Sequence, residues 1–345
     1  MLSWKNVNRI ILNFQKCRNI LILYVETQYL ASLFKQDARY CVSTNFIMQN
    51  PWLLSIRPKT LPLALSSTII GSCLAAAYGA FSWWVFVLAA LTTLLLQILS
   101  NMTNDYGDFV NGKDTEERIG PERMVQSGEI SPKVMLRGMI IVGLLCTASG
   151  ISLIIIGTKG LAINSTLIFI LLGVVAIIAA IKYTVGKNPF GYKGWGDIFV
   201  FIFFGLVGVI GTYFLHTQTF NFYLLLPAAA IGFLSTGVLN LNNMRDYEQD
   251  KKAGKQTLVV RMGLKNASYY HALLLAAACD SAIIYTLLNY NSHWQWLFVL
   301  SFPLLFLNAK KALTFKDPIE LYPELKKLSM ASLIFAISFG LGLIL

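Results

Sequence analysis

Residues 82–108 read SWWVFVLAALTTLLLQILSNMTNDYGD, an apolar run with the length of a membrane span that ends in a polar, acidic cluster. A second apolar run ends in the same way at residues 242–250, which read NNMRDYEQD. Carboxylates are costly at the edge of a hydrocarbon layer, so two such clusters need a function. The two stretches therefore predict a membrane protein whose chemistry lies at the ends of its helices.

The composition agrees with that interpretation. The chain is 56 % hydrophobic and 13 % charged, with a mean hydropathy of +0.60, which is typical of an integral membrane protein and excludes a soluble domain. The net charge of +11 does not indicate nucleic acid, because the lysines and arginines lie between apolar segments, where anionic lipid explains them. The five cysteines are scattered and form no CxxC pair, so they support neither a disulfide framework nor a zinc site.

About nine segments after residue 50 have the length and hydropathy of transmembrane helices. They cover roughly residues 61–79, 82–103, 134–156, 161–182, 197–215, 222–243, 268–289, 294–313 and 327–345. The sequence thus predicts an all-α, polytopic helical bundle of about nine transmembrane helices around one central, cytoplasm-facing cavity.

Basic residues fall in every second connecting segment, and the remaining connections hold only Lys159. The positive-inside rule then predicts a multi-pass protein of the cell inner (plasma) membrane, with the N-terminus and the long loops in the cytoplasm and the C-terminus outside.

Residues 1–49 differ from the rest of the chain. They are basic and hold one short apolar stretch, residues 20–25, which is too short to span a membrane. We interpret them as an N-terminal extension of unknown role, produced by an over-long start assignment or forming an interfacial helix. The transmembrane domain is expected to cover residues 50–345.

The acidic clusters have a spacing that suits metal binding. If the chain is helical there, Asn101, Asp105 and Asp108 share one helix face, and Asp246 and Asp250 share another. Two facing sets of carboxylates are what hard cations that bridge a diphosphate require, since Mg²⁺ takes oxygen ligands and shares them with substrate phosphates.

Candidate phosphate-binding groups lie beside these acids. Guanidinium groups suit bidentate capture of phosphate, and an ammonium or a tyrosine hydroxyl can also donate to it. Asp197 opens the fifth apolar segment, either as a helix cap or as a functional acid. The candidate donors are Arg118 and Arg123 after the first cluster, Lys255 after the second, and Tyr183 with Lys187, at helical spacing, after the fourth apolar segment.

These motifs together resemble the UbiA-type intramembrane prenyltransferase superfamily, over roughly residues 50–345. Within it, the stretch Asn104-Asp-Tyr-Gly-Asp108 and the loop that follows are similar to the branch that acts on 1,4-dihydroxy-2-naphthoate in menaquinone biosynthesis. One departure is Gly112, which stands where many members of the superfamily have a third aspartate; the nearest acid is Asp114, and its part in metal binding stays open.

The resemblance implies a Mg²⁺-dependent transfer of a polyprenyl chain from its diphosphate to 1,4-dihydroxy-2-naphthoate, with membrane lipids as surroundings. The departing diphosphate would be stabilised by basic groups and metal. The implied metal ligands are Asp105, Asp108, Asp246 and Asp250. The implied diphosphate-stabilising residues are Arg118, Arg123, Tyr183, Lys187 and Lys255, with Asn101, Asn104 and Asn242 for metal or cation stabilisation and Asp197 as an orienter or base for the aromatic substrate.

Two alternatives remain at this point. The same fold could act on another acceptor, such as 4-hydroxybenzoate, homogentisate, a haem precursor or chlorophyllide. An ion-coupled secondary transporter is the alternative from a different class, although transporter acids usually lie near the membrane midplane and these lie at span ends.

Overall fold

Helix α5 (Trp83–Val110) shows how the apolar segments fold. Within hydrocarbon a helix satisfies its own backbone hydrogen bonds, so a long apolar run becomes a helix. At 1.5 Å per residue its 28 residues extend over about 42 Å, which exceeds a hydrocarbon layer of about 30 Å. The helix therefore continues through the acidic cluster, and Asn101, Asp105 and Asp108 share a face as predicted.

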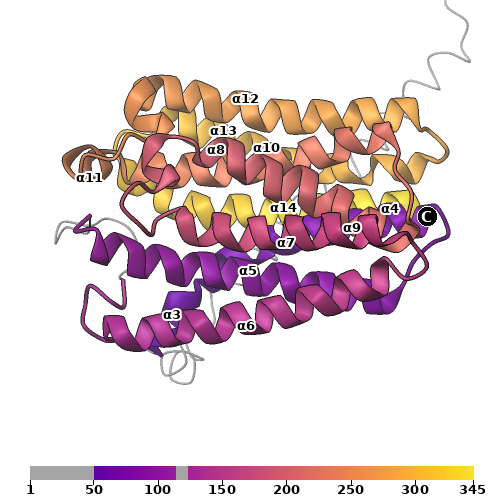
Figure 1. The fold of residues 1–345 in the computed structure, drawn as a ribbon. Helices are drawn as coiled ribbons and strands as arrows, with labels where there is room; N and C mark the ends of the chain where they lie inside the picture. Colours follow the sequence, from indigo (N-terminus) through magenta and orange to yellow (C-terminus); the bar gives the residue numbers. More distant parts are fainter. Residues whose placement is uncertain (1–49, 114–122) are drawn as a thin grey trace, which may run out of the picture. The chain divides into compact units, whose positions relative to one another are not determined.

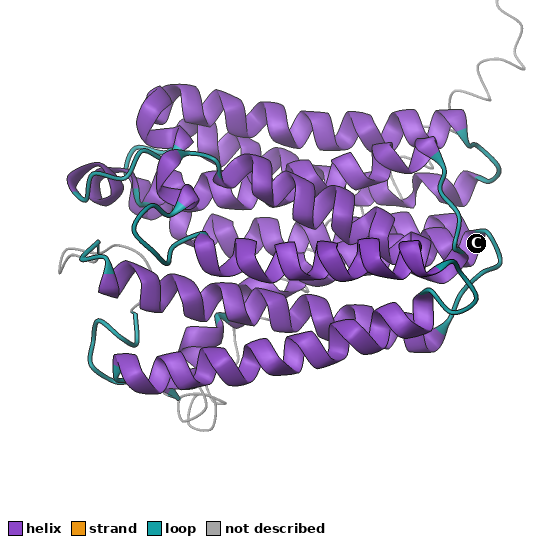
Figure 2. Ribbon diagram, viewed as in Figure 1, coloured by secondary structure: helices purple, strands orange, loops and turns teal. Residues whose placement is uncertain are grey.

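The computed structural model describes residues 50–113 and 123–345. In this part of the chain all regular elements are helical and none is a strand (Figure 2). Nine helical segments are long and apolar enough to cross a membrane, which confirms the predicted bundle. They are Pro51–Ala77, Trp83–Val110, Pro132–Gly157, Ile163–Lys182, Gly196–Thr217, Phe222–Arg245, Leu258–Leu288, His293–Thr314 and Pro318–Ile344.

Several of these spans consist of more than one element (Figure 1). Besides α5, the elements are α3 (Pro51–Ile56), η1 (Pro58–Thr60), α4 (Leu61–Ala77), α6 (Pro132–Gly157), α7 (Ile163–Lys182), η2 (Phe190–Lys193), α8 (Gly196–Val200), the π-helical η3 (Phe201–Ile210), α9 (Gly211–Thr217), η4 (Phe222–Leu224), α10 (Leu225–Arg245), α11 (Tyr247–Lys252), α12 (Leu258–Leu288), η5 (His293–Ser301), α13 (Phe302–Thr314), η6 (Pro318–Leu321) and α14 (Tyr322–Ile344).

Helix α10 lies at the centre of the packing. It contacts α12, α14 and η3, and most of its side chains are buried. Helix α5 packs against α4 and α6, whereas α7 contacts only a few neighbours and has no buried residue. The helix that carries the second cluster is therefore held firmly, and α7 covers one side of the bundle.

Helix α11 and the last turn of α5 lie at the same end of the helices, and the C-terminus lies at the other (Figure 1). Both acidic clusters are thus at one end of the bundle. The cytoplasmic orientation of that end stays a prediction, as does the boundary between residues 49 and 50. The predicted extension, residues 1–49, lies outside the described residues.

Candidate functional site: an acid pair beside an apolar cavity

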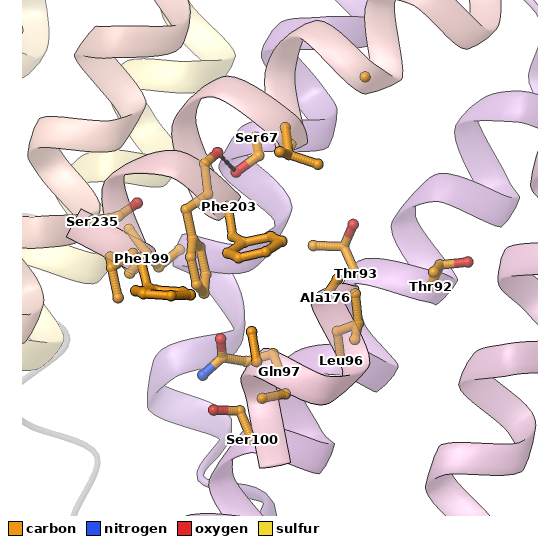
Figure 3. Close-up of a pocket in the computed structure, with 18 of the residues that line it drawn as sticks. Ser67, Thr92, Thr93, Leu96, Gln97, Ser100, Ala176, Phe199, Phe203 and Ser235 are labelled. Carbon is orange, nitrogen blue, oxygen red and sulfur yellow. Dashed lines mark hydrogen bonds between the residues drawn. The ribbon is translucent and has the colours of Figure 1, made fainter. Parts of the chain in front are cut away.

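A cavity of about 370 Å³ runs between the helices. One wall is a face of α5 with residues at helical spacing, and from Ala89 to Asn104 this face is about 22 Å long. The rings of Phe199 and Phe203 lie across the cavity from Leu96 (Figure 3). The α5 residues that line the cavity are Ala89, Thr92, Thr93, Leu96, Gln97, Ser100, Asn101 and Asn104.

The two ends of this cavity differ in chemistry. One end is lined by apolar side chains such as Leu153 and Phe169, and the other by Arg57, Asn104 and Tyr183. A long apolar tail with a polar head would match that gradient. The predicted central cavity is therefore present, with polar groups on the side of the acidic clusters.

The decisive contact joins the two acidic clusters. The ammonium of Lys255 lies 3.2 Å from Asp108 Oδ2 and 3.2 Å from Asp250 Oδ1. Asp108 also accepts from the Tyr192 hydroxyl and pairs with the Arg123 guanidinium, and it is only 2 % exposed. Carboxylates that are 142 positions apart in the sequence thus share one cation, one helical turn beyond Asn104 on α5.

Further hydrogen bonds fix the segments that carry these groups. Lys113 Nζ donates to the Ala253 carbonyl at 2.6 Å, which ties the chain after α5 to the loop after α11. Asn111 Nδ2 donates to the Thr184 carbonyl at 2.7 Å, and the Gln256 amide donates to the Tyr192 carbonyl at 2.7 Å. The loops that follow α5, α7 and α11 therefore form one assembly around the acid pair.

Gly107 allows this assembly to close. A Cβ atom at this position would lie 2.7 Å from Thr184 Oγ1 and 2.8 Å from its carbonyl oxygen, closer than real Cβ contacts. The glycine in Asn-Asp-Tyr-Gly-Asp is thus required by the close approach of α5 to the end of α7.

Asp105 has a different environment from Asp108. Its two carboxylate oxygens accept from the backbone amides of Met124, at 3.0 Å, and Val125, at 3.2 Å. It is buried, at 2 % exposure. These bonds anchor the chain immediately after Arg123, so Asp105 positions that arginine.

Asp246 is held by its neighbour. Arg245 Nε donates to Asp246 Oδ1 at 2.7 Å and Arg245 Nη2 donates to Oδ2 at 2.6 Å, while Nη2 also donates to Asn242 Oδ1 at 2.8 Å. The guanidinium lies over the Tyr322 ring, 5.7 Å from its centroid. Arg245 therefore forms a two-point ion pair with the Asp246 carboxylate.

The second cluster is not one continuous helix. Asp246 stands between α10 and α11 with φ −91 and ψ 10, and only Asp250 lies inside α11. The Asp250 backbone N–H nevertheless donates to the Asp246 carbonyl at 2.8 Å, so the predicted helical spacing at i and i+4 is present as the first turn of α11, with Asp246 as its N-cap. Burial raises the pKa of Asp250, and the Lys255 ammonium opposes that rise.

Tyr183 lines the cavity, but Lys187 does not. Helix α7 ends at Lys182, so the predicted helical spacing of Tyr183 and Lys187 is wrong, and Lys187 is exposed in the turn that follows. Burial raises the pKa of the Tyr183 hydroxyl well above its ordinary value, and nearby carboxylates, foremost Asp197, raise it further. The hydroxyl stays protonated and can donate to an anion.

Asp197 lies in the first turn of α8 and is 6 % exposed. Its Oδ1 atom is buried without a hydrogen-bond partner. Asp197 is not among the residues that line the cavity, although Val200, one turn later, is. Its predicted role with the aromatic substrate remains a prediction.

Asn101 and Asn104 line the polar end of the cavity, as does Asn242. The Asn101 amide is already in use, since Nδ2 donates to the Ile56 carbonyl at 2.7 Å and to Thr60 Oγ1 at 3.0 Å. Asn104 Oδ1 accepts from Thr184 Oγ1 at 3.2 Å.

Asn101 therefore secures the turn before η1. That turn carries Arg57 in a left-handed conformation, with φ 53, which is uncommon for a residue with a side chain. Arg57 lines the cavity from a backbone that the neighbouring hydrogen bonds hold in place.

Two predicted residues fall on a segment that the structure does not describe. Arg118 and Asp114 lie within residues 114–122, outside the described ranges. Among the described residues no three His, Cys, Asp or Glu side chains form a ready metal cage. A pair of carboxylates is nevertheless the donor set that Mg²⁺ uses when substrate phosphates complete its shell.

Comparison with known proteins decides the family. The model for the UbiA prenyltransferase family matches residues 64–333, most of the chain. The chain belongs to the UbiA prenyltransferase family.

The curated relatives of this UbiA-family protein agree in name. One from Haemophilus influenzae, named 1,4-dihydroxy-2-naphthoate octaprenyltransferase, is 47 % identical over 296 residues, which are 85 % of this chain and 96 % of the relative. Another of the same name, from Escherichia coli, is 45 % identical over 294 residues, or 85 % of this chain and 95 % of the relative.

A solved structure of a UbiA homolog from Archaeoglobus fulgidus bound to GPP and Mg²⁺ has a TM-score of 0.59 at 18 % identity, covering 86 % of this chain and 99 % of that one. At that identity it shows a common fold alone.

Two residues at the site were given no role in the sequence analysis. Arg57 lines the cavity, and Tyr192 donates to Asp108. Arg57 stands four residues before the first predicted span, residues 61–79, and an arginine at that place was a usable signal. Tyr192 stands in a short connection without any motif, and only the folded contacts reveal it.

Proposed function

We propose that this protein transfers a polyprenyl chain from its diphosphate to 1,4-dihydroxy-2-naphthoate and so forms demethylmenaquinol, the two-electron-reduced form of demethylmenaquinone. The C–O bond of the allylic diphosphate breaks, and its electron pair leaves with the diphosphate. The ring carbon that bears the carboxylate then attacks the allylic cation and forms the new C–C bond. The carboxylate departs as CO₂, and the electron pair of the broken bond restores the aromatic ring.

The observation that carries this proposal is the bridge from Asp108 through Lys255 to Asp250 beside the polar end of an apolar cavity. The apolar part suits a polyprenyl tail, and the acid pair with its cations suits a diphosphate. Relatives at 45–47 % identity are named for the same reaction, with an octaprenyl chain.

The residues of this chain divide the work by charge. Arg123, Lys255 and the protonated Tyr183 hydroxyl donate to the diphosphate, whose negative charge grows as the C–O bond breaks. Phe199 and Phe203 present aromatic groups to the cavity, where a cation is favoured by ring faces and shielded from water.

Arg57 supplies a guanidinium at the polar end of the cavity, where it can pair with the carboxylate of the naphthoate. Fixed in this way, the acceptor ring would present its carboxylate-bearing carbon to the tail of the first substrate.

Magnesium is part of the proposal. The oxygen donors Asp108 and Asp250 would hold the ion, with Asp246 nearby, and when bound it neutralises phosphate charge and so promotes loss of the diphosphate. We also propose that the acid-bearing end faces the cytoplasm at the cell inner membrane, because the basic connections lie on that side.

The test is an incubation of the purified protein with geranyl to octaprenyl diphosphates and one acceptor at a time. We expect a prenylated, decarboxylated naphthoate by mass spectrometry only when Mg²⁺ is present. Product from 4-hydroxybenzoate or homogentisate alone would show that the proposed acceptor is wrong. Ion-coupled uptake by vesicles, without any prenylated product, would show that the protein is a transporter and not a prenyltransferase.

A further inference from the structure

Lys255 occupies an unusual position for a phosphate-binding lysine. Its ammonium lies 3.2 Å from Asp108 and 3.2 Å from Asp250, so the two carboxylate oxygens are no more than twice that distance apart. The three side chains are all buried. The Tyr192 ring lies beneath the ammonium, with its centroid 5.0 Å away. Lysine thus stands between the two carboxylates where a bridging cation would stand.

We propose that Lys255 holds the position of a divalent cation in the unloaded protein and moves from the carboxylates to the diphosphate when metal and diphosphate bind. This inference rests on the proposed function, and it adds a second role for Lys255 that precedes the chemistry. Tyr192 is its positioning residue, since it supports the ammonium with its ring and Asp108 with its hydroxyl.

The physical reason is the repulsion between two buried carboxylates. Two such charges in a protein interior must be compensated, and an ammonium between them does so without metal. A divalent ion that replaces the ammonium supplies the same compensation with one more positive charge. The displaced ammonium is then available for the diphosphate, whose oxygens accept its hydrogen bonds.

The neighbouring Arg123 is less suited to exchange. Its guanidinium pairs with Asp108 and also donates to the Asn104 carbonyl at 2.7 Å, and the chain next to it is anchored by Asp105. Lysine, in contrast, carries a compact charge on a flexible four-carbon stem. Of the two cations on Asp108, Lys255 is therefore the exchangeable one.

The test separates metal binding from diphosphate binding by calorimetry. Mn²⁺ alone and Mn²⁺ with inorganic diphosphate are titrated into the wild type and into Lys255→Met. The variant lacks the competing ammonium, so we expect it to bind Mn²⁺ alone about tenfold more tightly, a coupling in the range of close charge pairs. The same variant should bind inorganic diphosphate, in the presence of Mn²⁺, about tenfold more weakly, because its phosphate donor is gone.

Lys251→Met is the matched control. It removes the same charge from the same segment, but Lys251 is exposed and lies over the Tyr247 ring at 5.8 Å. We expect its affinity for Mn²⁺ to stay within about twofold of the wild type, because exposed charges are screened. A lysine that only binds phosphate would leave the metal affinity unchanged, and a merely structural lysine would lower both affinities.

Folding of the variant gives a further readout. Without Lys255 the carboxylates repel, so thermal unfolding of Lys255→Met should shift upward with Mn²⁺ more than that of the wild type. A variant that folds only with Mn²⁺ supports the proposal, and one that is unfolded under both conditions contradicts it. Metal affinity of Lys255→Met equal to that of Lys251→Met overturns the inference. If the wild type binds neither Mn²⁺ nor diphosphate, the proposed function itself fails.

Discussion

Replacement of Asp105 separates an anchoring role from a metal-binding role. Asp105 accepts from the Met124 and Val125 amides at 3.0 and 3.2 Å and is 2 % exposed. Asp105→Ala leaves two buried backbone donors without partners, at about 1–3 kcal/mol each, so we expect a loss of about 2–6 kcal/mol in the free energy of unfolding. Asp105→Asn keeps one acceptor oxygen, so its free energy of unfolding should fall by only about 1–3 kcal/mol.

The assay is unfolding in mixed micelles, combined with calorimetry of Mn²⁺ and of inorganic diphosphate. Loss of the anchor releases the chain beside Arg123, so binding of diphosphate should weaken in Asp105→Asn while its affinity for Mn²⁺ alone stays within about twofold. The family resemblance implies instead that Asp105 holds Mg²⁺. Unchanged stability of Asp105→Ala together with lost Mn²⁺ binding would refute the anchoring role.

Other perturbations address the closed loops, the metal and the cavity. Gly107→Ala places a Cβ 2.7 Å from Thr184 Oγ1 and should lower the free energy of unfolding by about 1–3 kcal/mol. Gly143→Ala is the control, because a Cβ there has open space around it and should not destabilise the protein. Equal unfolding midpoints of the two variants would contradict the close packing at Gly107. Removal of divalent ions with EDTA should abolish prenyl transfer, and Mg²⁺ should restore it; turnover that persists in EDTA would exclude the metal. Ala176→Phe adds a ring to the cavity lining and should lower turnover of long-chain diphosphates at least about tenfold, as measured by a radiolabelled product assay. Activity equal to that of the wild type would mean that the prenyl tail binds elsewhere.

Much of the fold could be predicted because membrane spans are read directly from apolar length. Every predicted span has a helix at its place, and the acidic face of α5 follows from helical spacing of Asn101, Asp105 and Asp108. The convergence of two clusters was also predictable, since both end apolar runs on the same side. The family match and the relatives confirm the reaction class that the motifs suggested.

The predictions that were wrong or missing depend on where a helix ends and on tertiary contacts. Spacing cannot show that α7 ends at Lys182, so that Tyr183 and Lys187 do not share a helical face. Nor can it show that the four aspartates have different partners: backbone amides for Asp105, an arginine for Asp246, and one shared lysine for the other two. Tyr192 belongs to no sequence motif, and its contact with Asp108 follows only from the packing of η2.

The convergence of Asp108 and Asp250 on one ligand is tested most directly by a double-mutant cycle. The affinity for Mn²⁺ with inorganic diphosphate is measured for the wild type, for Asp108→Asn, for Asp250→Asn and for the double variant. If both carboxylates serve one metal–diphosphate complex, the two losses are not additive, and the coupling exceeds about 1 kcal/mol. Losses that add within about 0.5 kcal/mol would mean that the two acidic clusters act independently, and would contradict a shared site.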